Sequence, residues 1–391
     1  MSEIDEFYFP EEVFTTNILV RLPIKSLLRF KCVNKRFYSI ICSPYFARLH
    51  LNELPASQLN RHLLIKHKTI FLSFDFDSLR AAARADCCPF RYRGGFFEDG
   101  SRLASIIESK FDVRHSYIFA VGSCDGLVCV EAGEPYLLYI WNPTTLECRE
   151  IRVPEGQEKY GVVYGFRCDT SVKNDYKVVR ICQKMSKRET IIIQVFSLSE
   201  NSWTSSHEQL DGYGERPELT GIGVSVNDIT YWLYKAYETD DIQEVHWWII
   251  GYEWVTRKMK RVPPLPEWQM SGSQCPPMMY VMEGRLCACW RTNKNDDYLN
   301  VGMMKEGSWM KLYVITQSYV VYAMKFGHQG MHNITDKGSF AIQVGQTEED
   351  ILLVDLTRKP PRDARSLRIP SSANLVNYTQ TLVSPFVQSF K

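Results

Sequence analysis

The feature that most constrains this fold is a unit of two strands around a polar turn, which recurs between residues 137 and 369. In each unit an apolar stretch is followed by turn residues and by a second stretch that carries an aromatic or basic residue. This pattern is typical of β-strands. The units cover residues 137–151, 192–203, 248–262, 299–311 and 351–369. Because one such unit cannot bury its own apolar face, the pattern predicts that the units stack on one another.

The spacing of these units predicts a β-propeller. Their turns recur at intervals of roughly 46 to 60 residues, close to the kelch-type period of about 50 residues for each blade. A propeller leaves only short, protected strand edges, which suits a chain with many strands and little helical periodicity apart from residues 102–109. We therefore expect a large all-β domain, and its length of roughly 330 residues predicts a six-bladed kelch-like β-propeller.

The two ends of this region predict how the propeller closes. Residues 374–383 have a strand pattern but no blade of their own, and residues 62–74 lack enough following strands to complete one. If these ends did not share a sheet, the terminal blades would present open edges. The sequence therefore predicts that residues 374–383 pair with residues 62–74.

The first fifty residues have a helical pattern instead. Apolar residues at helical spacing over 13–22 precede Pro23, which forces a break, and a second set follows over 24–28. Asn34 is a good N-cap for a third helix, which Pro44 is expected to stop. Three short helices bury little surface alone, so this unit is expected to present apolar surface to a partner. The alternative is a helical cap packed on the rest of the chain.

The string from Leu22-Pro23 to Lys35 resembles the F-box of plant F-box proteins. The resemblance implies an all-α module that performs no chemistry and binds a Skp-type adaptor, and through it cullin and RING subunits. It implies adaptor-binding residues at Pro10, Ile18, Leu19, Leu22, Pro23, Leu27, Leu28, Phe30, Lys31, Cys32, Val33, Lys35, Phe37, Ile40, Ile41 and Pro44. Phe37 departs from the family, which usually has Trp there, so this contact loses an indole N–H.

The β-rich region resembles the F-box-associated interaction domain of the same plant proteins. The resemblance rests on four strings in order, Gly122 to Leu127, Trp141 to Thr145, Tyr164 to Phe166 and Asn174 to Arg180. It implies a domain that binds a protein substrate. The expected boundaries are an F-box over 7–52, a linker over 53–61, a substrate-binding domain over 62–386 and a tail over 387–391.

Composition excludes several classes of protein. The net charge is +1, which gives no general case for nucleic-acid binding, although the F-box segment is locally basic and suits an acidic partner surface. The N-terminus is acidic and polar, unlike a signal peptide, and no apolar run reaches the roughly 18 residues that cross a membrane. The twelve cysteines are irregularly spaced and are expected to be reduced and buried, Cys287 and Cys289 included. We expect no metal and no cofactor.

Residues 78–115 fit the repeat poorly and interleave Arg with aromatic residues. That composition matches binding hot spots, and a solvated insertion in the first blade is the alternative. In the pair Trp247-Trp248, adjacent strand side chains face opposite ways, so one of the two is expected to reach solvent or another blade. The candidate substrate-binding residues are Arg91, Tyr92, Arg93, Phe96, Phe97 and Trp247.

Residues that could indicate an enzyme are few. Ser225 lacks the final Gly of a nucleophile elbow. His328 and His332 have the spacing of a helical metal site, but Gly327 and Gly330 argue against a helix there. We expect no catalytic residue.

The two resemblances together imply the substrate-recognition subunit of a Skp–cullin–F-box ubiquitin ligase. Such a subunit binds a protein for ubiquitination and proteasomal degradation in the cytoplasm or nucleus. Two alternatives stay open, namely an adaptor-bound protein that sequesters its target, and recognition of a self-incompatibility ribonuclease in a plant reproductive tissue. A propeller enzyme or sugar binder would need a funnel of carboxylates or His that the sequence does not supply.

Overall fold

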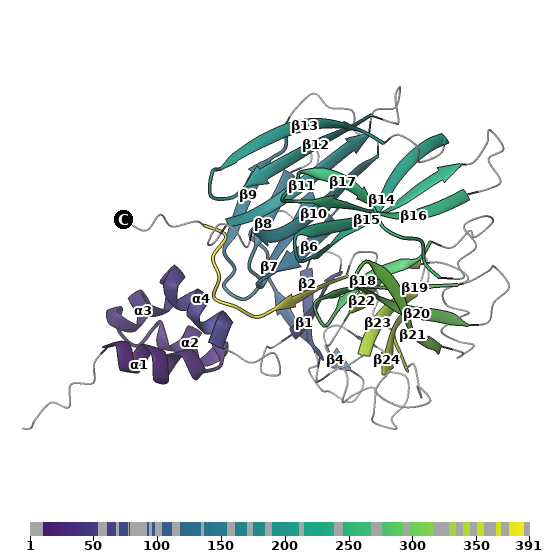
Figure 1. Ribbon diagram of the computed structural model, residues 1–391. Helices are drawn as coiled ribbons and strands as arrows, with labels where there is room; N and C mark the ends of the chain where they lie inside the picture. The colour runs from purple at the N-terminus through teal and green to yellow at the C-terminus, as the bar shows by residue number, and fades with distance from the viewer. Residues whose placement is uncertain are drawn as a thin grey trace, which may run out of the picture.

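The strands form six four-stranded sheets and one two-stranded sheet in the computed structural model (Figure 1). The structure describes residues 11–53, 61–67, 70–76, 78, 92–93, 96–97, 104–111, 118–133, 137–154, 161–169, 175–183, 190–210, 215–237, 245–266, 276–291, 298–315, 328–333, 339–344, 350–355, 365–368 and 375–386.

Five of the four-stranded sheets each use four consecutive strands, as propeller blades do. Blade 1 contains β6 (Ile118–Cys124), β7 (Leu127–Ala132), β8 (Leu137–Trp141) and β9 (Cys148–Arg152). Blade 2 contains β10 (Val162–Asp169), β11 (Asp175–Gln183), β12 (Thr190–Ser197) and β13 (Ser202–Gln209). Blade 3 contains β14 (Glu215–Val226), β15 (Ile229–Tyr237), β16 (Val245–Glu253) and β17 (Lys258–Arg261). Blade 4 contains β18 (Met278–Met282), β19 (Arg285–Trp290), β20 (Leu299–Lys305) and β21 (Ser308–Ile315). Blade 5 contains β22 (His328–Asn333), β23 (Ser339–Val344), β24 (Asp350–Asp355) and β25 (Arg365–Arg368).

The remaining four-stranded sheet joins the two ends of the β-rich region, and we call it the closing sheet. Its strands, in spatial order, are β26 (Leu375–Thr379), β1 (Arg61–His67), β2 (Ile70–Asp75) and β5 (Ala104–Ile107). β26 pairs antiparallel with β1, with Val376 opposite Leu64. β26 also contacts β22 of blade 5 and β6 of blade 1, so this sheet completes the ring.

The prediction of a β-propeller is confirmed, and so is the pairing of residues 374–383 with residues 62–74. The blade count needs a correction: five blades, not six, consist of consecutive strands, and the further four-stranded sheet is the closing sheet. The count from length was too high because that length includes the residues of the closing sheet, which is not a blade of consecutive strands. The helix suggested over 102–109 is also wrong, because residues 104–107 form β5 and pair with β2.

The cores lie between neighbouring sheets, as propeller packing requires. One cluster joins blades 1 and 2, another blades 2 and 3, another blades 3 and 4, and one joins the closing sheet to blade 1. Trp141, Trp232 and Trp290 are among the largest fully buried side chains. Trp232 lies in the core between blades 2 and 3, and Trp290 lies in the core between blades 3 and 4.

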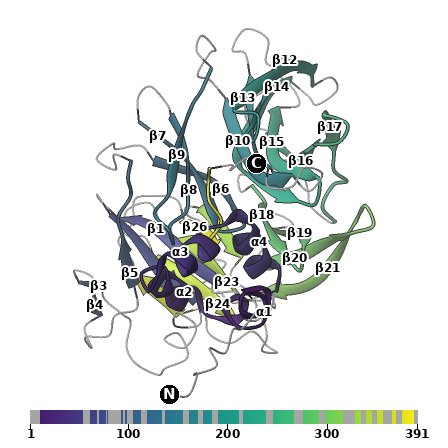
Figure 2. The same cartoon turned by 90° about the vertical axis from the view of Figure 1, so that its left-hand side faces the viewer.

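The N-terminal helices lie on one side of the ring (Figures 1 and 2). They are α1 (Glu11–Asn17), the 3₁₀ helix η1 (Leu19–Arg21), α2 (Ile24–Phe30), α3 (Lys35–Ile41) and α4 (Pro44–Glu53). The prediction of three helices was too low, because Pro44 begins a fourth helix as well as following the third. Proline fits the first turn of a helix, where its missing N–H costs nothing.

The segment rich in Arg and aromatic residues forms a short hairpin outside the blades. β3 (Tyr92–Arg93) pairs with β4 (Phe96–Phe97), with Tyr92 opposite Phe97. Arg91 lies outside the described residues.

Candidate adaptor-binding surface and its junction with the propeller

Two local caps shape the helical unit. Asn34 is the N-cap of α3 as predicted, and its side chain accepts a hydrogen bond from the Phe37 backbone N–H at 2.8 Å. Ser43 connects α3 to α4, because its hydroxyl donates to the Ile40 carbonyl at 2.8 Å and accepts from the Phe46 N–H at 3.1 Å. Asn34 therefore fixes the start of α3, and Ser43 fixes the turn between α3 and α4.

The helices enclose a small apolar core. Its buried members are Leu19, Val20, Ile24, Leu27, Ile41, Phe46, Ala47 and, from the C-terminal segment, Leu382. Phe37 lies at the edge of this core, where its ring stacks on Phe14 at 5.4 Å and contacts Phe30 at 6.0 Å. The half-buried Phe37 therefore helps to hold α1, α2 and α3 together.

The predicted adaptor-binding residues fall into three groups. Leu19, Leu27 and Ile41 are buried, so they support the surface from beneath. The half-buried members are Leu22, Leu28, Phe30, Lys31, Phe37, Ile40 and Pro44. The exposed members are Ile18, Pro23, Cys32, Val33 and Lys35, and Pro10 lies outside the described residues.

Three exposed apolar side chains on the helices were missed by sequence reasoning. Val13, Tyr38 and Tyr45 are 39%, 57% and 60% exposed, which is comparable to Ile18 at 43% and Val33 at 60%. Tyr38 could have been found, because it sits next to Phe37 on a short amphipathic helix and must face away from the core. The result is an apolar surface on the helices, which we call the F-box face.

Cations accompany this apolar surface. Arg21, Lys25, Arg29, Lys35 and Arg36 are exposed, and Lys31 is half-buried. Exposed apolar side chains and cations on the same helices suit a partner that presents apolar pockets and acidic residues.

A buried histidine supports the loop at Leu22-Pro23. His50 of α4 is 1% exposed, and its Nε2 lies 2.9 Å from the Leu22 carbonyl oxygen. Burial lowers the pKa of His50, so the neutral imidazole donates its proton to that carbonyl. Residue 22 therefore has a structural role in addition to any contact with a partner.

Arg48 joins the helical unit to blades 1 and 2. Its guanidinium lies 2.5 Å from Asp125 Oδ2 in the β6–β7 turn and 2.7 Å from the Tyr176 hydroxyl on β11. The Tyr176 hydroxyl also donates to Asp125 at 3.0 Å. Burial, followed by the nearby charge of Asp125, raises the pKa of Tyr176, so this phenol stays protonated and can donate. All three groups are thus paired in one network.

The C-terminal segment 380–386 runs between the helices and the ring (Figure 1), and we call it the strap. Leu382 is buried in the helical core, whereas Val383 packs in the core of blades 1 and 2. Asn142 of blade 1 donates to the Thr381 carbonyl at 3.1 Å and to the Val383 carbonyl at 2.7 Å. Two neighbouring residues of the strap therefore contribute to different cores.

Gly126 explains how the strap passes so close to blade 1. It has φ +83°, and a Cβ there would overlap the Thr381 hydroxyl and lie 2.5 Å from the Thr379 carbonyl oxygen. Thr381 in turn donates to the Asp125 carbonyl at 2.8 Å. The strings at residues 122–127 and 141–145 thus hold the strap in place, a role that sequence reasoning did not foresee.

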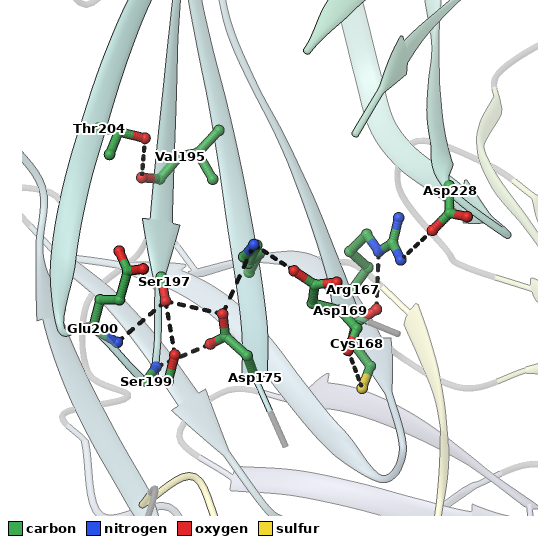
Figure 3. A network of polar contacts seen from close by, with 11 residues as sticks. Arg167, Cys168, Asp169, Asp175, Val195, Ser197, Ser199, Glu200, Thr204 and Asp228 are labelled. Carbon is green, nitrogen blue, oxygen red and sulfur yellow. Dashed lines mark hydrogen bonds and ion pairs between the residues drawn. The ribbon is translucent and has the colours of Figure 1, made fainter. Parts of the chain in front are cut away.

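The string at residues 174–180 is also structural. Asp175 is 2% exposed and accepts hydrogen bonds from the Ser197 hydroxyl and the Ser199 N–H, both at 2.9 Å (Figure 3). It thereby fixes the β12–β13 turn. In the same region Arg167 of β10 lies 2.8 Å from Asp228 in the β14–β15 turn, which ties blade 2 to blade 3.

One candidate substrate-binding residue, Trp247, is buried, so the prediction that it binds substrate at the surface is wrong. Trp247 is buried in the core of blades 3 and 4, and is not exposed on the surface. Its neighbour Trp248 is half-buried and lies 5.0 Å beneath the Arg261 guanidinium. For Tyr92, Arg93, Phe96 and Phe97 the structure gives the backbone pairing alone.

The prediction that the cysteines are buried holds for Cys287 and Cys289 but is wrong for Cys32, which is exposed. Burial raises the pKa of Cys287 to about 12. Within the described ranges, no three His, Cys, Asp or Glu side chains cluster in a way that could hold a metal ion. None of the described helices is long and apolar enough to cross a membrane.

Comparison with known proteins agrees with the two units of this fold. The family model "F-box domain" matches residues 14–49, and the model "F-box associated beta propeller domain" matches residues 96–359, which is more than half of the chain. The protein is therefore an N-terminal F-box followed by a β-propeller, and it belongs to the F-box-associated β-propeller family.

Named relatives of this chain are also F-box proteins. The F-box protein CPR1 of Arabidopsis thaliana is 24% identical over 401 residues, which cover 94% of this chain and 87% of the relative. An F-box/kelch-repeat protein of the same plant is 27% identical and covers 63% of each chain. Among solved structures, a mutant of AofleA from Arthrobotrys oligospora matches at 8% identity and a TM-score of 0.43, covering 82% of this chain and 89% of that one.

Proposed function

We propose that this protein is the substrate-recognition subunit of a Skp–cullin–F-box ubiquitin ligase. The F-box face binds a Skp-type adaptor, the adaptor brings the cullin and RING subunits, and the propeller holds a protein substrate. The observation that carries the proposal is the F-box face itself, which exposes Ile18, Val33 and Tyr38 on a helical unit that also exposes several cations. Several large apolar side chains exposed on so small a unit indicate a protein-binding surface.

The proposed role in ubiquitination is proximity. The chain raises the effective concentration of substrate lysines near a ubiquitin thioester that it does not touch, and it supplies no catalytic group. The junction supports this role, because Arg48, the strap and Leu382 fix the F-box against blades 1 and 2. A substrate bound to the propeller would then be held in a defined position relative to the adaptor. We place this activity in the cytoplasm or nucleus.

The two alternatives receive no specific support. Sequestration of a target without degradation would use the same surfaces. Recognition of a self-incompatibility ribonuclease gains nothing from residues 174–180, since Asp175 in that string serves the β12–β13 turn.

The experiment is affinity purification of the tagged chain from plant cells, with and without proteasome inhibition. Val33→Asp disrupts the F-box face, and Val255→Asp is the matched control, because Val255 is 77% exposed on the β16–β17 turn of the propeller. We expect adaptor and cullin to co-purify with the wild type and the control but not with Val33→Asp. A degraded substrate should accumulate on the wild type only when the proteasome is inhibited, and on Val33→Asp in either case.

The results distinguish a ubiquitin-ligase subunit from a protein that sequesters its target. Adaptor co-purifying equally with all three chains would overturn the assignment of the F-box face. A partner whose abundance on the wild type does not respond to the inhibitor would favour sequestration instead.

A further inference from the structure

A groove of about 680 Å³ lies between blades 3 and 4. Its walls include the β14–β15 turn at Asn227, the β18–β19 turn at Glu283 and the β20–β21 turn at Glu306. The β14–β15 and β18–β19 turns are equivalent to the β6–β7 turn of blade 1, where Arg48 of the F-box docks. The groove therefore opens on the side of the ring that carries the F-box, over blades that the F-box does not contact through Arg48 or the strap.

The floor of the groove is apolar and firmly built. Val226, Tyr231, Val262 and Leu286 line it, and all four belong to the core of blades 3 and 4. Half-buried Met304 of blade 4 extends this floor. An apolar floor of this kind can take an apolar side chain from a bound chain with little rearrangement.

Two tryptophans of blade 4 fix the end wall. Trp309 donates its indole N–H to the Pro263 carbonyl at 2.9 Å, and Trp290 donates to the Pro266 carbonyl at 3.0 Å. The segment after β17 is thereby tied across to the neighbouring blade. Because hydrogen bonds and prolines already hold this wall in place, a ligand that binds there loses little free energy to ordering it.

The rim carries charges of both signs. Lys260 and Arg285 supply two cations on exposed residues, whereas the Arg261 guanidinium lies 5.0 Å over the Trp248 ring, which packs against the core of blades 2 and 3. Glu283 and Glu306 stand on the two hairpin turns of blade 4. Their repulsion disfavours a long run of acidic residues, whereas one or two carboxylates can pair with the cations.

We propose that this groove binds a short peptide segment of a protein partner, in which an apolar side chain is flanked by one or two carboxylates. The apolar side chain occupies the floor, and the carboxylates face Lys260 and Arg285. The inference rests on the proposed function in one respect, namely that the propeller is the arm that holds the substrate. It adds the chemical class of the segment and the place where that segment binds.

The test uses fluorescein-labelled peptides and fluorescence anisotropy with the full chain. One peptide set places Leu or Phe between two Glu residues, and the matched set has Lys in place of Glu. We expect the Glu peptides to bind at least about tenfold more tightly than the Lys peptides. The double variant Lys260→Glu with Arg285→Glu should reverse that preference, since both side chains lie on the rim.

Arg152→Glu is the matched control, because the Arg152 side chain is 90% exposed on blade 1, outside the groove, and it should bind like the wild type. Tryptophan fluorescence confirms that each variant is folded. Equal binding of both peptide sets, absence of binding by either set, or an unchanged preference in the double variant would overturn the proposal. Adaptor binding is measured on the same preparations. If the peptide test fails while adaptor binding is intact, the groove proposal is wrong and the proposed function is unaffected.

Discussion

Leu382→Ala tests whether the strap joins the F-box to the propeller. Leu382 is 6% exposed and packs with Leu19, Leu27 and Phe46 in the core of the helical unit. Truncating a buried Leu to Ala costs about 2–5 kcal/mol, through lost apolar burial and the cavity left behind. Because the helices alone have so small a core, about 3 kcal/mol is a large share of their stability.

The two units can be monitored separately in one sample. All nine tryptophans follow residue 140, so tryptophan fluorescence reports on the propeller. The helical circular dichroism signal reports mainly on the F-box, since all the α-helices of at least seven residues that the structure describes lie within residues 11–53. Urea unfolding followed by both signals therefore tells which unit loses stability.

We expect Leu382→Ala to lower the midpoint of the helical transition and to leave most of the tryptophan transition in place. The matched control is Leu146→Ala, because Leu146 is 37% exposed on the β8–β9 turn and should change neither midpoint by much. A helical midpoint that is unchanged in Leu382→Ala would show that the C-terminal segment contributes nothing to the F-box, contrary to our reasoning.

Three further predictions concern the closing sheet and the strap. Gly126→Ala should destabilise the chain by about 1–3 kcal/mol in urea unfolding, because the new Cβ would overlap Thr381 at a positive φ; wild-type stability would contradict this. Removing residues 375–391 should abolish the cooperative tryptophan transition, because β26 pairs with β1 and closes the ring; loss of a single end without loss of the transition would contradict closure. Burial lowers the pKa of His62 to about 4, so its neutral form contributes stability above pH 6.5, and up to roughly 3 kcal/mol is lost as the pH falls towards 4. His62→Gln should remove most of the loss of stability between pH 6.5 and pH 4. If the variant loses as much stability as the wild type over that range, protonation of His62 is not the cause.

Much of the fold could be predicted from local signals. Asn34 marks the start of α3 because a short polar side chain can cap a helix, and the structure shows that bond. The strand pattern at residues 374–383 lacked partners nearby in sequence, and the need to avoid open edges predicted its pairing with β1.

The features that were predicted wrongly or missed depend on contacts between distant residues, which no local sequence pattern encodes. Proline is compatible both with the end of one helix and with the start of the next, so residue type alone does not show that Pro44 begins α4. Leu382 shares a core with residues more than 300 positions earlier, and nothing in its surroundings predicts which unit it joins. Strand alternation predicts that Trp247 and Trp248 face opposite ways, but it does not tell which of the two is buried. Packing between blades decides that.

The most direct test of the central claim is a binding titration of the full chain with a recombinant Skp-type adaptor by isothermal calorimetry. We predict saturable binding with one adaptor for each chain, weakened at least about tenfold, or about 1.4 kcal/mol, by Val33→Asp and unchanged by Val255→Asp. Val33 is 60% exposed in the turn between α2 and α3, so this change tests the F-box face without removing a core residue. Absence of binding by the wild type, or equal binding by both variants, would contradict the account.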